Sequence, residues 1–258
     1  MLFEVKGLVV KTVDLKETDR LITIYTEEAG LITALAKGAR SLKSRKMSAT
    51  LQFCDRSFVL YERADKLWVK EACLIESFFD IRSTIEGLAL AGYIAEVVAD
   101  VGTADAEPDL LRLALNSLYA VSVGKYSLSK IKGAFEIRTS AILGFMPDVI
   151  NCHSCGRKDG EFFFDIMAGA LECTACHRLS EKKHITLTEE HESHILCILT
   201  EGAKTALGYC IYCPLEKLFS FNISDEDMHL FTRATEEYIL NHLERGFKSL
   251  DFYNEVKR

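Results

Sequence analysis

The sequence is short of proline, of glycine and of long apolar runs. It has 3 prolines and 15 glycines among 258 residues, which excludes a collagen-like chain and long disordered tails rich in these residues. No apolar run reaches the roughly 18 residues that a membrane-spanning helix needs. The first residues carry Glu4 where a secretory signal would have its basic start and apolar core. These absences predict a cytoplasmic protein.

Signatures of common enzyme classes are absent too. The sequence has no G-x-x-x-x-G-K-[ST] phosphate loop, no H-E-x-x-H zinc motif and no G-x-S-x-G serine elbow. His191 and His194 are three residues apart, and a solvated helix face explains them better than a metal site. Acid pairs such as Glu27 and Glu28 are adjacent, so their side chains point apart and do not converge as nuclease carboxylates do. The sequence therefore predicts a protein that is not an enzyme.

Nine cysteines are present, and four of them have the spacing of a metal site. Cys152 and Cys155 are followed after 17 residues by Cys173 and Cys176, which gives the pattern C-x2-C-x17-C-x2-C. Each two-residue gap allows one tight turn to direct two thiolates at the same ion. Four thiolates fill a tetrahedral shell, so the pattern predicts one structural zinc ion. His177 adjoins the ligands but is surplus to them, and we expect it on the surface.

The other five cysteines lack a complete ligand set. Cys210 and Cys213 repeat the two-residue gap, but their apolar surroundings favour buried thiols over a second metal site. Cys54, Cys73 and Cys197 fall within apolar periodic segments. We expect these three side chains in the core, where a free thiol behaves as a small hydrophobic group.

The charge is distributed unevenly along the chain. The net charge is −7, yet residues 1–80 hold 13 basic and 12 acidic side chains while the remainder is strongly acidic. Between Glu28 and Asp55 there is no acid, and like charges gathered there repel one another unless an anion compensates them. A phosphate-binding patch is therefore favoured over a solvated loop. The cations of this basic segment are Lys37, Arg40, Lys43, Arg45 and Lys46.

The first eighty residues predict five short strands, rich in β-branched and aromatic side chains. A small closed barrel suits such strands, because closure removes the edges that they would otherwise expose. An oligonucleotide-binding (OB) barrel is the predicted form, with the basic segment as one of its loops. The strands are expected at residues 3–15, 21–26, 31–35, 53–61 and 67–78.

From about residue 81 the apolar period becomes that of an α-helix. The predicted fold class is α+β, with an OB-type barrel over residues 1–80 and an all-α domain over 81–150 and 181–258. A zinc-ribbon-like finger over 151–180 is inserted into the helical domain. Helices are expected at about residues 85–98, 108–121, 127–143, 188–207 and 224–243.

The order of these parts, and several local sequences, resemble the RecO family of DNA recombination and repair proteins. The resemblance implies a non-enzymatic mediator that binds single- and double-stranded DNA and anneals complementary strands near the nucleoid. It also implies work with RecR to load RecA onto strands covered by single-strand-binding protein. The segments that carry the resemblance are 18–30, 36–40, 43–45, 135–138, 143–148, 217–221 and 245–250.

The resemblance further implies a pocket on the helical domain for the acidic, hydrophobic tail of single-strand-binding protein. Lys130 and Lys132, near the start of the third expected helix, are our candidates for that pocket. On the barrel, some aromatic side chains are expected to stack on bases, although a core position is favoured for most of them. These aromatic residues are Phe53, Phe58, Tyr61 and Trp68.

Two other functions stay open at the level of sequence. The first is a zinc-ribbon adaptor whose barrel binds a protein partner instead of DNA, and the basic segment argues against it. The second is a metalloenzyme, which would need a ligand position open to solvent. Four sulfur ligands on one ion would exclude that position.

Overall fold

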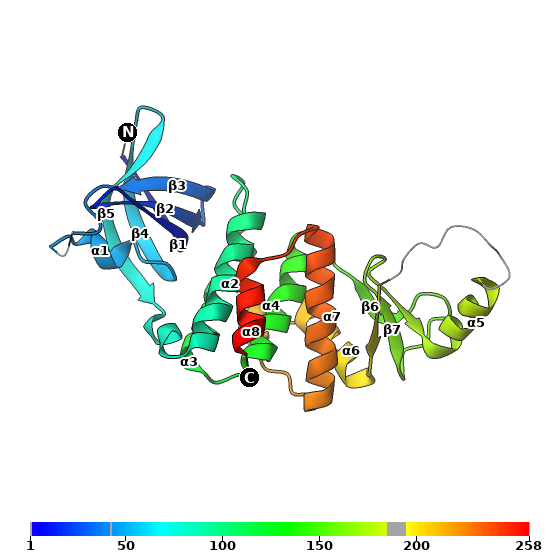
Figure 1. The fold of residues 1–258 in the computed structure, drawn as a ribbon. Helices are drawn as coiled ribbons and strands as arrows, with labels where there is room; N and C mark the ends of the chain where they lie inside the picture. The colour runs from blue at the N-terminus through cyan, green and yellow to red at the C-terminus, as the bar shows by residue number, and fades with distance from the viewer. Residues whose placement is uncertain (1, 42, 185–194, 258) are drawn as a thin grey trace. The chain divides into compact units, whose positions relative to one another are not determined.

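The structure is a computed structural model that describes residues 2–41, 43–184 and 195–257 (Figure 1). The chain forms two compact units. The first comprises Met1–Lys125 with Phe247–Arg258, and the second comprises Tyr126–Gly246. The domain boundaries expected from the sequence lie where the residue pattern changes, whereas these two units are defined by their compactness. The expected boundaries therefore stay a prediction.

The first unit begins with a closed five-stranded barrel, which confirms the predicted fold of this part. Its strands follow the order β1-β2-β3-β5-β4, and β4 closes the barrel by pairing with β1. All neighbours pair antiparallel except β3 and β5, which pair in parallel. The strands are β1 (Leu2–Leu15), β2 (Asp19–Thr26), β3 (Gly30–Ala36), β4 (Cys54–Arg63) and β5 (Lys66–Ser77).

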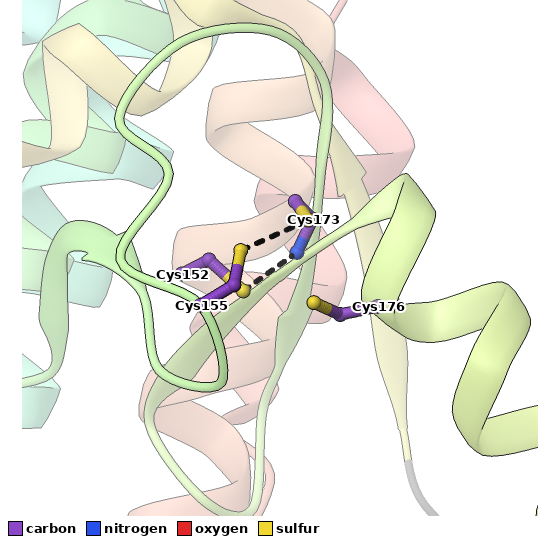
Figure 2. A group of neighbouring side chains, drawn as sticks. All are labelled: Cys152, Cys155, Cys173 and Cys176. Carbon is purple, nitrogen blue, oxygen red and sulfur yellow. Dashed lines mark hydrogen bonds between the residues drawn. The ribbon is translucent and has the colours of Figure 1, made fainter.

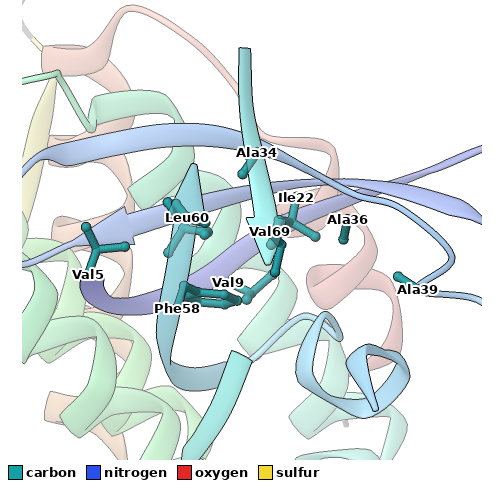
Figure 3. Packing of buried hydrophobic residues seen from close by; sticks show 10 residues of the cluster. Val5, Val9, Ile22, Ala34, Ala36, Ala39, Phe58, Leu60 and Val69 are labelled. Atoms are coloured by element: carbon teal, nitrogen blue, oxygen red, sulfur yellow. The ribbon is translucent and has the colours of Figure 1, made fainter. Parts of the chain in front are cut away.

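The alternating apolar side chains of these strands meet inside the barrel (Figure 3). Phe58 and Leu60 from β4 are fully buried there, as is Ile22 from β2. At the β4–β5 turn, Ala64 and Asp65 have φ values of 50° and 55°. Positive φ at both central residues of a two-residue turn matches the twist of antiparallel strands, so this turn fixes the register of the hairpin.

The three longer helices of the first unit are α2 (Ile85–Val101), α3 (Pro108–Val123) and α8 (Lys248–Val256). A short 3-10 helix, η1 (Phe79–Ser83), leads from β5 into α2. Helix α2 is apolar over most of its surface because it packs against α3, α8 and the barrel strands β1 and β2. Helix α8 was not predicted, since the last expected helix ended at residue 243.

The barrel is joined to the loop between α2 and α3 at its β2–β3 turn. The backbone N–H of Leu31 donates to the carbonyl of Thr103 over 2.8 Å. Gly30 has a φ of 56°, and a Cβ there would lie 2.2 Å from the Thr103 carbonyl oxygen. The Tyr25 hydroxyl adds a hydrogen bond to the carbonyl of Glu107, so the barrel and helices form one unit.

The second unit contains three helices that pack together, and the last two of them also contact the strands of a four-stranded sheet. The helices are α4 (Leu128–Ile142), α6 (Glu201–Tyr212) and α7 (Asp225–Leu243), with a 3-10 turn, η2 (Leu215–Lys217), between the last two. The strand order is β6-β8-β7-β9, and α5 (Thr174–His184) follows β8. No helix in the described part of the chain is long and apolar enough to cross a membrane. The strands are β6 (Asp148–Cys152), β7 (Phe162–Asp165), β8 (Ala170–Cys173) and β9 (Leu196–Leu199).

The helix expected over residues 188–207 is wrong over residues 195–199, which hold a strand, and is confirmed from Glu201 onward. Residues 188–194 lie outside the described residues. Cys197 and Leu199 are buried while Ile198 is 55% exposed, which is the period of a strand. This strand is β9, and the helix begins only after Thr200, whose hydroxyl accepts the backbone N–H of Ala203. The sheet of the expected finger therefore includes one more strand, β9, which comes from the chain after residue 180 and pairs with β7.

Helices α4 and α7 approach closely where Gly133 faces Phe231. A Cβ on Gly133 would lie 2.5 Å from the Phe231 ring, which is itself fully buried. By contrast, a Cβ on Gly208 in α6 would meet only Val149, at an ordinary 3.9 Å. The small residue in α4 is thus required by packing, whereas the one in α6 is not.

We expect Gly133→Ala to destabilise the second unit by about 1–3 kcal/mol, because the added methyl overpacks the α4–α7 contact. Gly208→Ala is the matched control and should stabilise its helix by up to about 1 kcal/mol, as alanine does inside a helix. Urea unfolding followed by circular dichroism measures both. Equal midpoints for the two variants would contradict the packing argument.

Candidate nucleic-acid interface and metal centre

The four predicted ligand cysteines come together in the second unit (Figure 2). Their sulfur atoms all lie within 4.8 Å of one another, and Cys155 Sγ lies 3.7 Å from Cys173 Sγ. A tetrahedral ion bound at about 2.3 Å from each sulfur separates the sulfurs by about 3.8 Å. Cys152 ends β6, Cys173 ends β8 and Cys176 lies in the first turn of α5. The geometry therefore fits one four-coordinate metal ion.

Backbone N–H groups favour the thiolate form of Cys152. Burial raises the pKa of Cys152, but N–H groups of Cys173, Cys155 and Ser154 donate to its sulfur and lower the pKa to about 6 overall. Hydrogen bonds with Cys155 and Cys173 raise the pKa of Cys176 to about 12. Four thiolates this close repel one another, so a cation between them is what allows all four to ionise.

Residues beside the cluster fix the elements that carry it. His177 is partly buried and not on the surface as expected, with Nδ1 3.0 Å from a Glu172 carboxylate oxygen. Its ring lies against Phe163, with 3.9 Å between the ring centroids. From α6, the Lys204 ammonium donates to the carbonyl of Lys158. These contacts hold α5 on β8 and hold the loop after the first cysteine pair on α6.

The remaining cysteines divide between core and surface. Cys54, Cys197 and Cys210 are buried as expected, and burial raises the pKa of Cys210. Cys73 is exposed, so its expected core position is wrong, because its side chain points outward from β5. Cys213 is half-buried, and its carbonyl accepts a hydrogen bond from Arg138.

The basic segment connects β3 to β4 and lies against the β1–β2 turn. The backbone N–H of Arg40 donates to the carbonyl of Thr18 over 2.9 Å, and that of Gly38 donates to Asp19. The Arg40 guanidinium lies 3.3 Å from Asp14 and donates to the carbonyl of Lys16. Arg40 therefore anchors the segment to the barrel as well as adding charge.

Lys46 is a second anchor, at the start of α1 (Lys46–Ala49). Its ammonium donates to the carbonyl of Val69 on β5 over 2.6 Å, and burial lowers its pKa. Lys37, Lys43 and Arg45 are exposed side chains on the same connection. The five cations thus comprise two that fix the segment, of which Arg40 is also exposed, and three further exposed side chains.

The four barrel aromatics occupy two different environments. Phe53 and Phe58 are buried, as favoured for most of the set. Tyr61 and Trp68 are half-buried neighbours on β4 and β5, with their rings stacked 6.3 Å apart at an angle of 19°. Of these four side chains, only the second pair has ring surface that solvent can reach.

Lys130 and Lys132 face the interior of the second unit, which contradicts their candidacy for a peptide-binding pocket. The Lys132 ammonium is 2.7 Å from Glu136 and 2.7 Å from Glu236, and Glu136 is fully buried. The Thr235 hydroxyl also donates to Glu136 over 2.8 Å. Lys130 donates to the carbonyl of Phe221 over 2.6 Å. The apolar period of a helix does not show whether a lysine on it faces solvent or pairs with a buried acid one turn away.

We expect Lys132→Met to destabilise the protein by about 3–5 kcal/mol, because it leaves Glu136 buried without its cation. Burial already raises the pKa of Glu136. In the variant its folded-state pKa lies further above the unfolded value, so the folded state binds the extra proton and part of the lost stability returns as the pH falls. Urea midpoints at pH 7 and pH 5 measure this. The exposed Lys158→Met is the control, and an equal midpoint for the two variants would contradict a buried ion cluster.

Comparisons with known proteins agree with these features. The family model described as recombination protein O N terminal matches residues 1–78, and the model described as recombination protein O C terminal matches residues 82–192. A protein of Acetivibrio thermocellus named DNA repair protein RecO is 35% identical over 98% of this chain and 96% of its own length. Proteins of the same name from Caldicellulosiruptor bescii and a Thermoanaerobacter species are 29% and 26% identical, each over 99% of this chain and at least 98% of its own length. The chain, with its five-stranded barrel and four-cysteine cluster, belongs to the RecO family of DNA repair proteins.

Proposed function

We propose that this chain is a recombination mediator that binds single- and double-stranded DNA and anneals complementary strands. With RecR, it helps to load RecA onto strands covered by single-strand-binding protein, whose acidic tail it contacts. The observation that carries the proposal is the set of exposed cations on an anchored barrel loop, in a member of a family of DNA repair proteins. The chain acts by binding and not by catalysis, in the cytoplasm beside the nucleoid.

The basic segment is suited to phosphates and not to particular bases. Arg45 can grip a phosphate through two parallel hydrogen bonds, while Lys37 and Lys43 act as point charges. Contacts of this kind depend little on sequence, and annealing requires that tolerance. Because Arg40 and Lys46 already hold the segment on the barrel, little loop entropy is lost when DNA binds.

We assign a structural zinc ion to the four cysteines, since four sulfur donors at this spacing are the preferred zinc set. Cys152, Cys155, Cys173 and Cys176 would hold it, with no position left for water or substrate. The ion would join β6, β8 and α5, which are short elements with little core of their own.

We expect the protein to accelerate annealing of complementary oligonucleotides coated with single-strand-binding protein, without ATP, as followed by fluorescence quenching. The triple variant Lys37→Gln, Lys43→Gln, Arg45→Gln should lose most of this acceleration, because it removes the exposed phosphate contacts. For single-strand binding, the slope of log K against log salt should also become less steep by about 2, since each of the three lost contacts accounts for roughly 0.7 of the slope.

The matched control removes the same number of charges elsewhere, at the exposed residues Lys158, Lys217 and Lys248. It should anneal like the natural chain. Equal loss in both triple variants would mean that net charge and not the basic segment governs binding. If the protein anneals bare strands but not coated ones, action on coated strands would require a partner such as RecR. If it anneals neither, the adaptor that binds a protein partner would be favoured.

We expect metal analysis to find one zinc per chain, and X-ray absorption to find four sulfur neighbours. Cys173→Ser should lose the ion and unfold the second unit at lower urea, since metal affinity contributes to folding, with about 10–16 kcal/mol of apparent binding free energy in small zinc domains. The exposed Cys73→Ser is the control and should keep both metal and stability. Three sulfurs with a water ligand would instead indicate the open site of a metalloenzyme.

A further inference from the structure

A pocket of about 380 Å³ opens in the first unit beside α1. It is formed by α1, the start of β4, the end of β5 and η1, with the Arg45, Arg56 and Arg82 side chains in its wall. None of the described residues that line it is acidic. A concave site with three guanidinium groups and no carboxylate attracts an anion.

Arg56 is the strongest sign that this pocket takes a ligand. It is 2% exposed, yet its guanidinium is charged at any physiological pH. Its Nη2 donates to the carbonyl of Ser48 over 3.1 Å, while its Nε is buried without a hydrogen-bond partner. Within the described ranges no carboxylate comes within ion-pair distance of it. Burial raises the pKa of the adjacent Asp55 carboxyl, while the backbone N–H of Arg56 and the Arg56 charge act in the opposite direction, so Asp55 compensates Arg56 only from beyond ion-pair distance.

A buried charge that is neither paired nor fully hydrogen-bonded is costly, and natural structures seldom retain one without a use. An anion seated in the pocket would supply the opposite charge beside the Arg56 guanidinium. The requirement comes from the burial of Arg56 and is independent of the exposed cations on the basic segment.

The opposite wall of the pocket is apolar and partly aromatic. Phe79 is 67% exposed and Leu74 is 55% exposed, both at the pocket. The Arg82 guanidinium lies 5.6 Å from the centres of the Phe79 and Phe53 rings and donates to the carbonyl of Gln52 over 3.0 Å. Arg82 is thus an exposed cation held in one place beside an exposed ring, a combination that suits a flat base next to its phosphate.

We propose that this pocket binds one nucleotide of a DNA strand, with its phosphate among Arg45, Arg56 and Arg82 and its base against Phe79. Arg45 belongs both to the basic segment and to the pocket wall, so a strand that follows the segment reaches the pocket. A run of cations leading to the site suits the evenly charged backbone of a nucleic acid better than a short acidic peptide. The inference rests on the proposed function and names a subsite within it.

The test uses the full-length protein and thymidine 5′-monophosphate, followed by nitrogen-15 chemical shifts. We expect shifts centred on Ala72, Phe79 and Arg82, and an affinity at least tenfold above that of thymidine or inorganic phosphate. Inorganic phosphate that binds as tightly as the nucleotide would overturn the base contact. A short peptide of aspartate and phenylalanine that binds there more tightly than the nucleotide would overturn the assignment to nucleic acid.

Two variants test the site without removing its buried arginine. Arg82→Gln keeps a donor for Gln52 but loses the charge, and Ser48→Glu places an acid at an exposed position of α1. Each should weaken nucleotide binding at least tenfold. Arg63→Gln, an exposed arginine at the far turn of β4, is the matched control and should bind normally. Unchanged binding in both pocket variants would overturn the proposal.

The subsite and the proposed function can fail separately. Lys37→Gln with Lys43→Gln should weaken binding of a long single strand and leave the mononucleotide affinity unchanged. If the mononucleotide fails to bind while strands still bind with steep salt dependence, only the subsite is overturned. If the mononucleotide binds and strands do not, the subsite holds as a nucleotide site and the strand-binding proposal falls.

Discussion

Closure of the barrel through β1 is the constraint on which the rest of the first unit depends. β1 pairs with β4 through its first half and with β2 through its second half, and Gly7 pairs on both sides. A Cβ on Gly7 would lie 2.4 Å from the carbonyl oxygen of Tyr25, so only glycine allows the strands to approach there. A bulge between Val9 and Lys11 then bends the strand from one partner toward the other.

Closure decides where the basic segment runs. Because β5 lies between β3 and β4 in the sheet, the chain cannot join β3 to β4 by a tight hairpin and must cross outside the barrel. The crossing comprises residues 37–53, and it contains all the cations of the acid-free stretch. A connection of this length would be mobile without anchors. Arg40 near its start and Lys46 just past its middle supply them, through Asp14 and the carbonyl of Val69.

The spacing of apolar residues along the chain and the residue types at turns were enough to predict the barrel strands and most helices. Strand β4 alternates buried and partly exposed side chains, and the helices expected from residues 127 and 224 begin at the N-caps Ser127 and Ser224. Helix α8 was missed because it is held by contacts distant in sequence, among them the Tyr93–Phe247 ring pair and the bond from the Ser249 N–H to Glu96.

The candidate sites were predictable to the extent that their members are neighbours in sequence. The cysteine pairs and the basic segment are local patterns, and the zinc spacing correctly brought Cys152 and Cys176 together across β7 and β8. Arg56 and Arg82 join the basic segment only in the folded barrel, so no spacing rule reveals them. Cys73 shows the converse error, since an apolar run does not tell which face of β5 is inward.

The way in which each buried charge is compensated distinguishes the structural sites of this molecule from the proposed ligand site. In the second unit, Lys132 is compensated by Glu136 and Glu236, and the cluster is complete without any ligand. The four cysteines need a cation to ionise together, and a metal ion would complete them with no open position. Arg56 in the first unit has no carboxylate within ion-pair distance among the described residues, and its Nε has no hydrogen-bond acceptor. In the proposed nucleotide site, the opposite charge comes from an anion outside the chain, and the pocket beside Arg56 is large enough for one to enter.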